Sequence, residues 1–594
     1  MIKKFILMVC GSFVGVTLAL MVFTLVAVIT SFAIMGSMGA SSATKSVDNN
    51  SILHIALEGD IPERDGNEDF NVTSMIYGGQ MPKSCASLET LKKAIENAAN
   101  DSKVKGIYLE CNGVDASPAT LYELRKALTD FKKESKKFIY SYAGSGYDEF
   151  DYYLASTADS IFINPEGAVD IHGLGSVTPF FKKLLDKVGV KMQVVRVGTF
   201  KSAVEPYILD SISPANRLQT EHYLGQIWNV MSKQISDSRN ITPERMKQLT
   251  DTVLMTLPVE FLKENKLVDG ICYKTEMDSR LRQLTEVNES EDPKLVDPDV
   301  MAASADNSSD GKSEIAVLYA VGEIDGRGAG IDSEDIVEQL RKLQNDDDVV
   351  GVVLRVNSPG GSAYGSEQMW KAIDDLKHSG KTVAVSMGDY AASGGYYLSC
   401  DADRIFAEPV TITGSIGIFA LIPDFTGLAT DKLGVNFSVV KTNRNSAFGA
   451  NFVQFTPEQL AALQNHVNRG YELFTKRCAD GRHMKQDSIK KIAEGRVWDG
   501  TTALKIGLVD QMGGLEDAIS YVAKKAKLAD GDYHVATYPE IKNDWKKMIM
   551  QFGQEKAQAE LEKKMGVFYT SYREVEDMLN RDRVLCLMPV SKIK

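Results

Sequence analysis

The chain contains the same sequence pattern twice, and this duplication constrains its fold more than any other feature. Lys103–Asn112 (KVKGIYLECN) resembles Asp348–Asn357 (DVVGVVLRVN), and Tyr152–Phe162 (YYLASTADSIF) resembles Tyr396–Phe406 (YYLSCDADRIF). The matching segments lie about 245 positions apart, which is the signature of a repeated structural unit. Because 594 residues are also too many for one hydrophobic core, we expect two copies of one domain.

Each copy alternates short runs of β-branched residues with helical patterns. In the second copy we predict buried strands at Ile315–Tyr319, Val349–Val356 and Thr382–Ser386, and crossover helices at Ser333–Leu343 and Ser366–His378. This alternation predicts an α/β fold in which helices cover a parallel sheet in each repeat.

Composition sets the expected domain boundaries. Residues 45–287 are predicted to form the first repeat, and residues 314–540 the second. Residues 288–313 between them are rich in Asp, Ser, Glu and Pro and have little apolar content, which is typical of a linker. Residues 541–594 follow the second repeat, and their charged, helical pattern predicts a helical extension for assembly or docking.

The N-terminal segment is apolar enough to cross a membrane. Residues 5–44 carry no charged side chain, and a bilayer span takes roughly 20 apolar residues. A cleaved signal peptide has a hydrophobic region of only about 7–15 residues, so we expect residues 1–44 to remain as a single-pass anchor. Lys3 and Lys4 precede the apolar run and predict a cytoplasmic N-terminus. The rest of the chain would then lie on the periplasmic side of a bacterial inner membrane.

Charge and metal-ligand spacing exclude several classes of function. The formal net charge of -13 disfavours binding to a phosphate backbone, so no nucleic-acid partner is expected. The seven cysteines and seven histidines are dispersed, without a C-x-x-C pair or an H-E-x-x-H motif. We therefore predict a mechanism that uses neither a metal nor a cofactor.

Two glycine-rich segments of the second repeat carry candidate chemistry, and each follows a predicted strand. They are Asn357–Ser362 (NSPGGS) and Asp389–Tyr397 (DYAASGGYY). Ser393 lies at the start of a predicted helix, where N–H groups have no partner within the helix. Glycine lets the backbone approach a substrate closely, so the N–H groups of Gly361 and Gly394 are predicted to form an oxyanion hole.

These segments are followed by Thr413–Gly417 (TGSIG) and Gly495–Trp498 (GRVW), and the set resembles the signal peptide peptidase A family, also called protease IV. The resemblance covers nearly all of residues 50–540 and includes the two-repeat layout and N-terminal anchor of the long bacterial form. It implies two repeats of the Clp protease and crotonase fold group. It also implies that Ser393 is a nucleophile and that Ser415 assists the base.

The same resemblance implies that the general base is a lysine of the first repeat, Lys201 in the segment RVGTFKSAVEP. To act as a base this lysine must lose its proton, and burial among apolar groups can lower its pKa by the required amount, about three units. In the register of the repeats, Ser393 corresponds to Glu149 and Lys201 corresponds to Asn445. Each copy thus keeps one half of a dyad, which predicts one composite site where the repeats meet.

The family resemblance further implies a homotetramer that degrades cleaved signal peptides and other hydrophobic or unfolded peptides. Three alternatives stay open at this point. The first is a crotonase-like enzyme acting on acyl-thioesters, and the second is an inactive membrane scaffold that binds peptides. The third is a serine peptidase whose base is one of the histidines of the second repeat: His378, His466, His483 or His534.

Overall fold

The computed structural model describes residues 47–65, 85–304, 311–326, 330–450, 452–529, 531–540 and 584–588. The predicted anchor, residues 1–44, lies outside these ranges, as does most of the predicted C-terminal extension. Within them, every helix is too short or too polar to cross a lipid bilayer.

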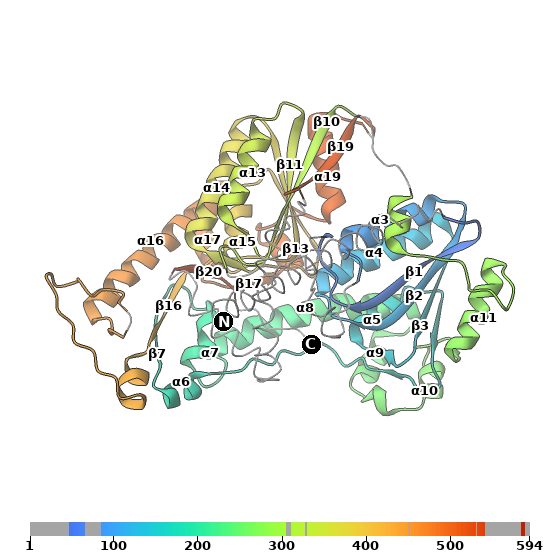
Figure 1. The fold of residues 1–594 in the computed structure, drawn as a ribbon, viewed down its shortest axis with the longest axis horizontal. Helices are drawn as coiled ribbons and strands as arrows, with labels where there is room; N and C mark the ends of the chain where they lie inside the picture. Colours follow the sequence, from blue (N-terminus) through green and yellow to red (C-terminus); the bar gives the residue numbers. More distant parts are fainter. Residues whose placement is uncertain are drawn as a thin grey trace, which may run out of the picture.

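The first repeat is built on a six-stranded parallel sheet (Figure 1). Its strand order is β8-β5-β3-β2-β1-β9, and every neighbouring pair is parallel. The central strands are buried along most of their length, as expected when helices cover the faces of a parallel sheet. The strands are β1 (Ser51–Gly59), β2 (Val104–Val114), β3 (Phe138–Ala143), β5 (Ser160–Ile163), β8 (Gly270–Ile271) and β9 (Leu295–Val296).

The second repeat has the same strand order, β18-β14-β13-β11-β10-β19. Two further strands, β15 (Ile412–Gly414) and β17 (Val497–Asp499), extend this sheet beyond the end of β13. The equivalent strands confirm the predicted duplication and the parallel α/β architecture. They are β10 (Ser313–Val321), β11 (Val349–Ser358), β13 (Thr382–Ala392), β14 (Arg404–Ala407), β18 (Gln511–Met512) and β19 (Tyr533–Tyr538).

Individual hydrogen bonds are duplicated as well. The Tyr152 hydroxyl donates to the carbonyl oxygen of Leu267 at 2.7 Å in the first repeat. In the second repeat the Tyr396 hydroxyl donates to the carbonyl oxygen of Leu508 at 2.9 Å. Both tyrosines are fully buried, so each hydroxyl needs this partner. The match fixes the register in which the two repeats are compared.

The helices predicted in the second repeat are confirmed as α13 (Ser333–Gln344) and α14 (Ala363–His378). In α13, Ile336, Leu340 and Leu343 recur at helical spacing and are buried against the sheet. The other helices of six or more residues are α3 (Leu88–Asn100), α4 (Pro118–Ser135), α5 (Glu149–Ala155), α6 (Lys182–Val188), α8 (Pro214–Arg239), α9 (Pro243–Thr250), α10 (Val259–Glu264), α11 (Lys274–Thr285), α12 (Pro298–Ala303), α15 (Gly394–Ser399), α16 (Pro457–Gly481), α17 (Gln486–Ile492), α18 (Gly500–Lys505) and α19 (Leu515–Ala526).

The predicted linker at residues 288–313 is wrong in part. Within it, β9 pairs with β1 and α12 packs against α3, so both elements belong to the first repeat. Val296 and Met301 are buried there, and the Asn97 amide donates to the Met301 carbonyl at 2.9 Å. The few apolar residues in this polar stretch are the ones that attach it to the core.

A third, antiparallel sheet joins the repeats in the order β12-β20-β16-β7. Strand β7 (Lys191–Arg196) of the first repeat pairs along its whole length with β16 (Phe419–Asp424) of the second. Strand β20 (Leu585–Leu587) lies between β16 and β12 (Gly360–Ser362). Residues 541–594 were predicted to form a helical extension. Of these, the structure describes residues 584–588, which contain β20. This segment is a strand there because it pairs with β12 on one side and β16 on the other.

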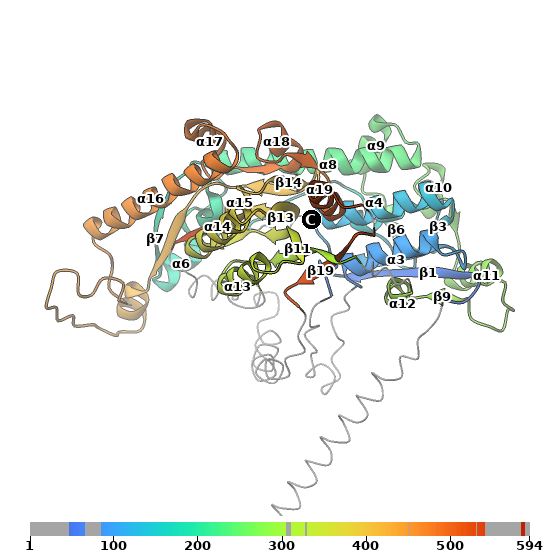
Figure 2. The same cartoon turned by 90° about the horizontal axis from the view of Figure 1, so that it is seen from above.

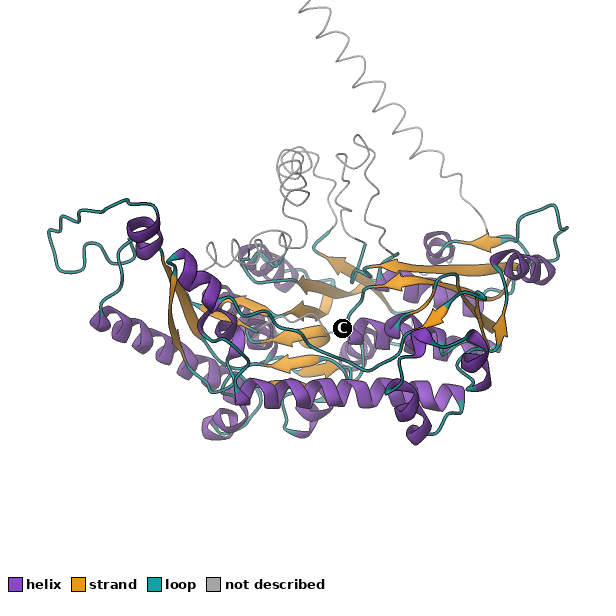
Figure 3. Cartoon of the chain, turned by 90° about the horizontal axis from the view of Figure 1, so that it is seen from below, coloured by secondary structure: helices purple, strands orange, loops and turns teal. Residues whose placement is uncertain are grey.

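The repeats also share hydrophobic and helical contacts. The long helix α8 of the first repeat extends across to the second repeat and packs on β17 (Figure 2, Figure 3). Ala392, Val410, Ile412 and Val497 of the second repeat belong to the buried apolar cluster of the first. The two repeats therefore bury one continuous interface.

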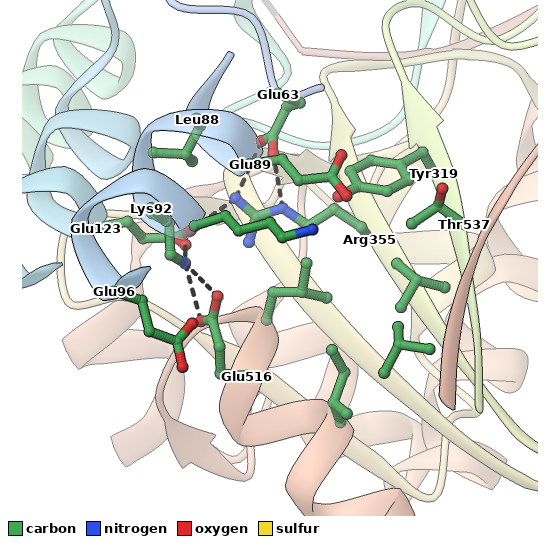
Figure 4. Close-up of a pocket in the computed structure, with 15 residues that line it drawn as sticks. Glu63, Leu88, Glu89, Lys92, Glu96, Glu123, Tyr319, Arg355, Glu516 and Thr537 are labelled. Atoms are coloured by element: carbon green, nitrogen blue, oxygen red, sulfur yellow. Dashed lines mark hydrogen bonds and ion pairs between the residues drawn. The ribbon is translucent and has the colours of Figure 1, made fainter. Parts of the chain in front are cut away.

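An ionic cluster crosses this interface and centres on Arg355 of β11 (Figure 4). Its guanidinium donates to Glu63 at 2.9 Å and to Glu123 at 2.6 Å, and both carboxylates come from the first repeat. Lys92 also binds Glu123 at 2.7 Å and reaches Glu516 of α19. Burial alone would raise the pKa of Glu123, but Arg355 and Lys92 lower it to about 2. Glu123 is thus charged at neutral pH, whereas burial raises the pKa of Glu63 above its usual value.

A cavity of about 290 Å³ lies beside this cluster, between the two repeats. Glu89, Lys92 and Tyr319 line it together with Arg355 (Figure 4). None of the predicted catalytic residues is among its lining residues. The cavity is therefore a feature of the interface and not the candidate active site.

We predict that Arg355→Leu lowers the free energy of unfolding by about 3–5 kcal/mol, because Glu63 and Glu123 would stay buried without their partner. Urea denaturation at pH 7 measures the loss. The matched control is Arg444→Leu, which removes an exposed ion pair with Glu458 and should cost about 0–1 kcal/mol. Equal losses in the two variants would contradict a structural role for the buried cluster.

Candidate active site

Ser393 lies at the junction between β13 and α15, as the N-cap residue of that helix. Its backbone adopts φ 55° and ψ -111°, a conformation that is rare for a residue with a side chain. The conformation is held because its N–H donates to the Gly414 carbonyl at 2.8 Å and its carbonyl accepts from Tyr397 at 2.8 Å. Strained residues of this kind cluster at functional sites.

Ser415 follows β15 and has a similar backbone strain, with φ 49°. Its N–H donates to the carbonyl of Arg496 at 2.7 Å, which fixes the turn. Its hydroxyl lies 3.3 Å from the Gly495 carbonyl, which can accept a hydrogen bond from it. Ser415 is therefore held with its side chain oriented by the segment around Gly495.

Lys201 of the first repeat reaches both serines of the second. Its Nζ lies 2.7 Å from the Ser393 Oγ, 3.1 Å from the Ser415 Oγ and 3.0 Å from the Ser415 carbonyl oxygen. All three residues are fully buried. Residues 192 positions apart in sequence are thus in direct hydrogen-bond contact, and they come from different repeats.

Burial changes the acid–base chemistry of this lysine. Removal from water disfavours the charged form, and it lowers the pKa of Lys201 to about 7. The three oxygens around Nζ belong to uncharged hydroxyl and carbonyl groups, so none of these described partners offsets the loss of solvation. A neutral amine with the geometry to accept a proton from Ser393 is therefore available near neutral pH.

The loop that carries Lys201 is fixed against the second repeat. The N–H of Phe200 donates to the carbonyl of Glu494 at 2.9 Å. Gly495 has φ 75°, and a Cβ there would lie 2.7 Å from the Cβ of Lys201, so only glycine permits this approach. Gln219 of α8 donates to Phe200 and accepts from Val497, which ties the loop to β17.

The predicted oxyanion-hole residues are Gly361 in β12 and Gly394 at the start of α15. Gly394 follows the serine directly, and a Cβ on the neighbouring Gly360 would lie 2.8 Å from the Gly394 nitrogen. Gly361 has φ 151°, and a Cβ there would lie 2.2 Å from the Ile324 carbonyl oxygen. Strand β12 (Gly360–Ser362), which is buried and paired with β20, therefore runs directly beside the residue that follows Ser393.

The counterparts in the other copy are not paired with each other in this way. Glu149 begins α5 at the position of Ser393 and accepts from the N–H of Gly173 at 2.9 Å. Asn445 is exposed and accepts from the amide of Gln459 at 3.0 Å. The described residues thus bring one Ser–Lys pair together.

Of the four histidines that were alternatives for the base, His483 is exposed just after α16, and the other three have other neighbours. His378 contacts its own helix through Asp374, and His466 lies near Arg469 on the surface. His534 contacts the Gly311 carbonyl at the far edge of the sheet. The structure describes no histidine in hydrogen-bond contact with Ser393.

Sequence reasoning missed two positioning residues, although both lie in the quoted motifs. Asn357 donates to Glu63 at 2.8 Å and to Asp389 at 3.0 Å. Asp389 accepts from both the N–H and the hydroxyl of Thr120 at 2.9 Å. The polar residue that starts each glycine-rich segment therefore binds the first repeat. Asn357 and Asp389 are polar side chains within the otherwise buried strands β11 and β13. This placement is the signal that could have identified them from the sequence.

Known proteins are similar to this chain in sequence. The model of peptidase family S49 matches residues 131–288 and again residues 375–529, one match in each repeat. The chain belongs to peptidase family S49. Protease 4 of Haemophilus influenzae is 33% identical to this S49 peptidase over 461 residues, which is 75% of this chain and 74% of that protein.

Other relatives agree with this assignment. The chloroplastic serine protease SPPA of Arabidopsis thaliana is 30% identical over 77% of this S49 chain and 69% of its own length. A putative signal peptide peptidase SppA of Enterococcus faecium is 37% identical over 36% of this chain and 60% of its own. The predicted family and the prediction of a two-repeat serine peptidase are therefore confirmed.

Proposed function

We propose that this S49 peptidase is a membrane-anchored serine endopeptidase with a Ser393–Lys201 dyad. The observation that carries the proposal is the 2.7 Å contact between the Lys201 Nζ and the Ser393 Oγ in a fully buried setting. A nucleophile needs a base within hydrogen-bond reach, and this pair meets that geometric condition. Ser415 would orient the amine, because it offers two oxygens to Nζ.

In the proposed reaction, the Ser393 Oγ attacks the substrate carbonyl carbon while Lys201 takes the hydroxyl proton. The N–H groups of Gly361 and Gly394 stabilise the oxyanion, and preorganised donors of this kind contribute roughly 3–4 kcal/mol each. Lys201 then gives its proton to the leaving amine. Water, deprotonated by Lys201, hydrolyses the ester and frees Ser393.

We predict that Lys201→Met reduces kcat/KM by about 10²- to 10⁴-fold, the usual contribution of a general base, and that Ser393→Ala abolishes turnover. A fluorogenic peptide with Ala or Leu before the cut is the substrate. In the wild type, kcat/KM should rise as the pH rises through about 7, because the base is the neutral amine.

Two matched controls accompany these variants. Ser399→Ala removes another buried serine of the same helix, and Lys371→Met removes a surface lysine. Both should keep wild-type kcat/KM. Circular dichroism checks that every variant is folded. An active, folded Lys201→Met variant would show that the base lies elsewhere, and turnover of thioesters without peptides would favour the crotonase-like alternative.

The proposed substrates are cleaved signal peptides and other hydrophobic or unfolded peptides, and the proposed location is a bacterial inner membrane. Residues 5–44 support the anchor because they carry no charge. Lys3 and Lys4 support a cytoplasmic N-terminus with the catalytic repeats on the periplasmic side. An enzyme held there would meet spent signal peptides where they are released.

We also propose that the chain forms a homotetramer. Within one chain, β7 of the first repeat pairs with β16 of the second. The segments equivalent to β7 and β16 in the other repeat are Asn436–Lys441 and Gly175–Phe180, and neither belongs to a strand that the structure describes. Both expose apolar side chains, with Val177 91% and Val440 96% accessible. Pairing between copies would bury them and generate a ring.

We predict that the full chain sediments with membranes and, once extracted in detergent, has the mass of a tetramer by light scattering. Val440→Asp should shift that mass to smaller species, because a charge would enter the strand pairing. Val253→Asp, at another exposed valine, is the matched control and should leave the mass unchanged. A Val440→Asp tetramer would contradict this interface, and a freely soluble full chain would contradict the anchor.

A further inference from the structure

A second cavity between the two repeats, of about 250 Å³, is lined by an excess of carboxylates. One wall comes from α3 and α4 of the first repeat, and the other comes from Glu408, which follows β14, and from the start of α19. It shares four lining residues with the cavity shown in Figure 4. The carboxylates that line it are Glu96, Glu123, Asp130, Glu134, Glu408, Glu516 and Asp517, and the ammonium groups are Lys92 and Lys126.

The two lysines of this cavity already have anionic partners. Lys126 binds Asp130 at 3.0 Å, and Lys92 binds both Glu123 and Glu516. Negative charge therefore exceeds positive charge along the walls. The lining carboxylates that have no hydrogen bond or ion pair with any residue that the structure describes are Glu96, Glu134 and Glu408.

Glu408 is the unpaired carboxylate that water reaches least. It is 3% accessible, whereas Glu96 and Glu134 are exposed. Its Oε1 and the Oε2 of Glu123 both lie close to Gly514, because a Cβ on that glycine would be 3.1 Å from the first oxygen and 3.3 Å from the second. Burial and the neighbouring Glu123 carboxylate raise the pKa of Glu408 to about 8. A buried polar group without a partner is costly, and a cation placed here would remove that cost.

The walls of the cavity suit an organic ammonium ion better than a metal ion. Among the described residues, no group of three or more His, Cys, Asp or Glu side chains is placed to hold a metal ion. Ile95, Ala99, Ala127 and Phe131 line the same cavity and would contact a methylene chain. The two exposed carboxylates can pair with a second ammonium group. The volume lies below the roughly 300–1,000 Å³ of pockets for drug-sized molecules, so the ligand is small.

We propose that this cavity binds an aliphatic diamine or polyamine, with one ammonium group between the carboxylates of Glu408 and Glu123. Such a ligand would contact α3 and α4 of the first repeat and α19 of the second, so it would bind the closed arrangement of the repeats. A ligand that binds only the folded state stabilises it, and the amine should therefore raise the temperature of unfolding. The proposal goes beyond the proposed function and does not depend on it, because neither Ser393 nor Lys201 lines the cavity.

Isothermal titration calorimetry of the full chain in detergent, with spermidine as the probe, tests the proposal. We expect one bound molecule per chain in the wild type. Glu408→Gln keeps the size of the side chain and removes its charge, and it should weaken binding by at least about tenfold. Gly514→Ala should weaken binding too, because its Cβ would stand beside both carboxylates, and φ -98° accepts alanine without strain. Glu264→Gln removes an exposed carboxylate elsewhere and is the matched control with wild-type affinity.

The pH dependence is a readout that attraction to the protein surface would not give. The raised pKa of Glu408 means that the free carboxyl group is mostly protonated at pH 7, and a bound cation favours its charged form. Binding should therefore release a proton, and the affinity should rise between pH 6.5 and 8. Titrations in two buffers of different ionisation enthalpy measure that proton, and Glu408→Gln should release none.

The groups that surround Glu408 keep their charge over this interval. The pKa of Glu123 is about 2, and the pKa values of Lys92 and Arg355 are raised by their carboxylate partners. The charged and titratable groups that face Glu408 are Lys92 of α3, Tyr122, Glu123 and Lys126 of α4, Tyr153 of α5, Arg355 of β11 and Asp517 of α19.

Three results would overturn the proposal. The first is that spermidine does not bind to the folded full chain, and the second is that Glu408→Gln binds it as tightly as the wild type. The third is that an equal concentration of Mg²⁺ displaces spermidine, because a hydrated metal ion cannot make the apolar contacts. Thermal unfolding of the same proteins gives an independent check: spermidine should raise the midpoint of the wild type and of Glu264→Gln, but not that of Glu408→Gln.

Discussion

The contact on which the rest of the structure depends is that between the Lys201 amine and the Ser393 hydroxyl. A lysine side chain is costly to bury, and the cost falls when the amine is neutral and has hydrogen-bond partners. Here the partners are hydroxyl and carbonyl oxygens, which favour the neutral form over an ion pair. Full burial in turn requires that the two repeats stay closed around the contact. The charged cluster at Arg355 and the shared apolar interface provide that closure, and they lie away from the chemistry.

Duplication explains how one site arises from two similar domains. Each repeat supplies the same sheet, and each places a helix start after its third core strand. Only the second copy has serine there, whereas the first has Glu149. Only the first copy presents a lysine from the loop after β7, and its counterpart Asn445 is exposed. Neither repeat can therefore assemble the pair alone. The polar residues Asn357 and Asp389 connect the motifs of the second repeat to the first, so the position of the Ser393 segment depends on contacts with the first repeat.

Much of this was predictable from the sequence because the signals were local or repeated. The strands β10, β11 and β13 were predicted from β-branched runs, and the pairing of Lys201 with Ser393 was proposed from the repeat register and the family motifs. The Arg355–Glu63 contact spans 292 positions and has no local pattern, so only the folded chain reveals it. The strand β20 was missed for a related reason: a short apolar run, residues 584–588, after a long charged stretch gives no clear strand signal until two sheet edges flank it. Val296 and Met301 were likewise too few to distinguish a packed segment from a linker.

The most direct measurement is the rate at which a fluorophosphonate labels Ser393, located by peptide mass spectrometry, in the wild type and in Lys201→Met. This reagent reports the activation of the hydroxyl without any assumption about the natural substrate. The account predicts rapid labelling of Ser393 in the wild type at pH 8 and at least about a hundredfold slower labelling in the folded variant, the lower range of a general-base contribution. Equal labelling rates in the two proteins would contradict a composite site built from both repeats.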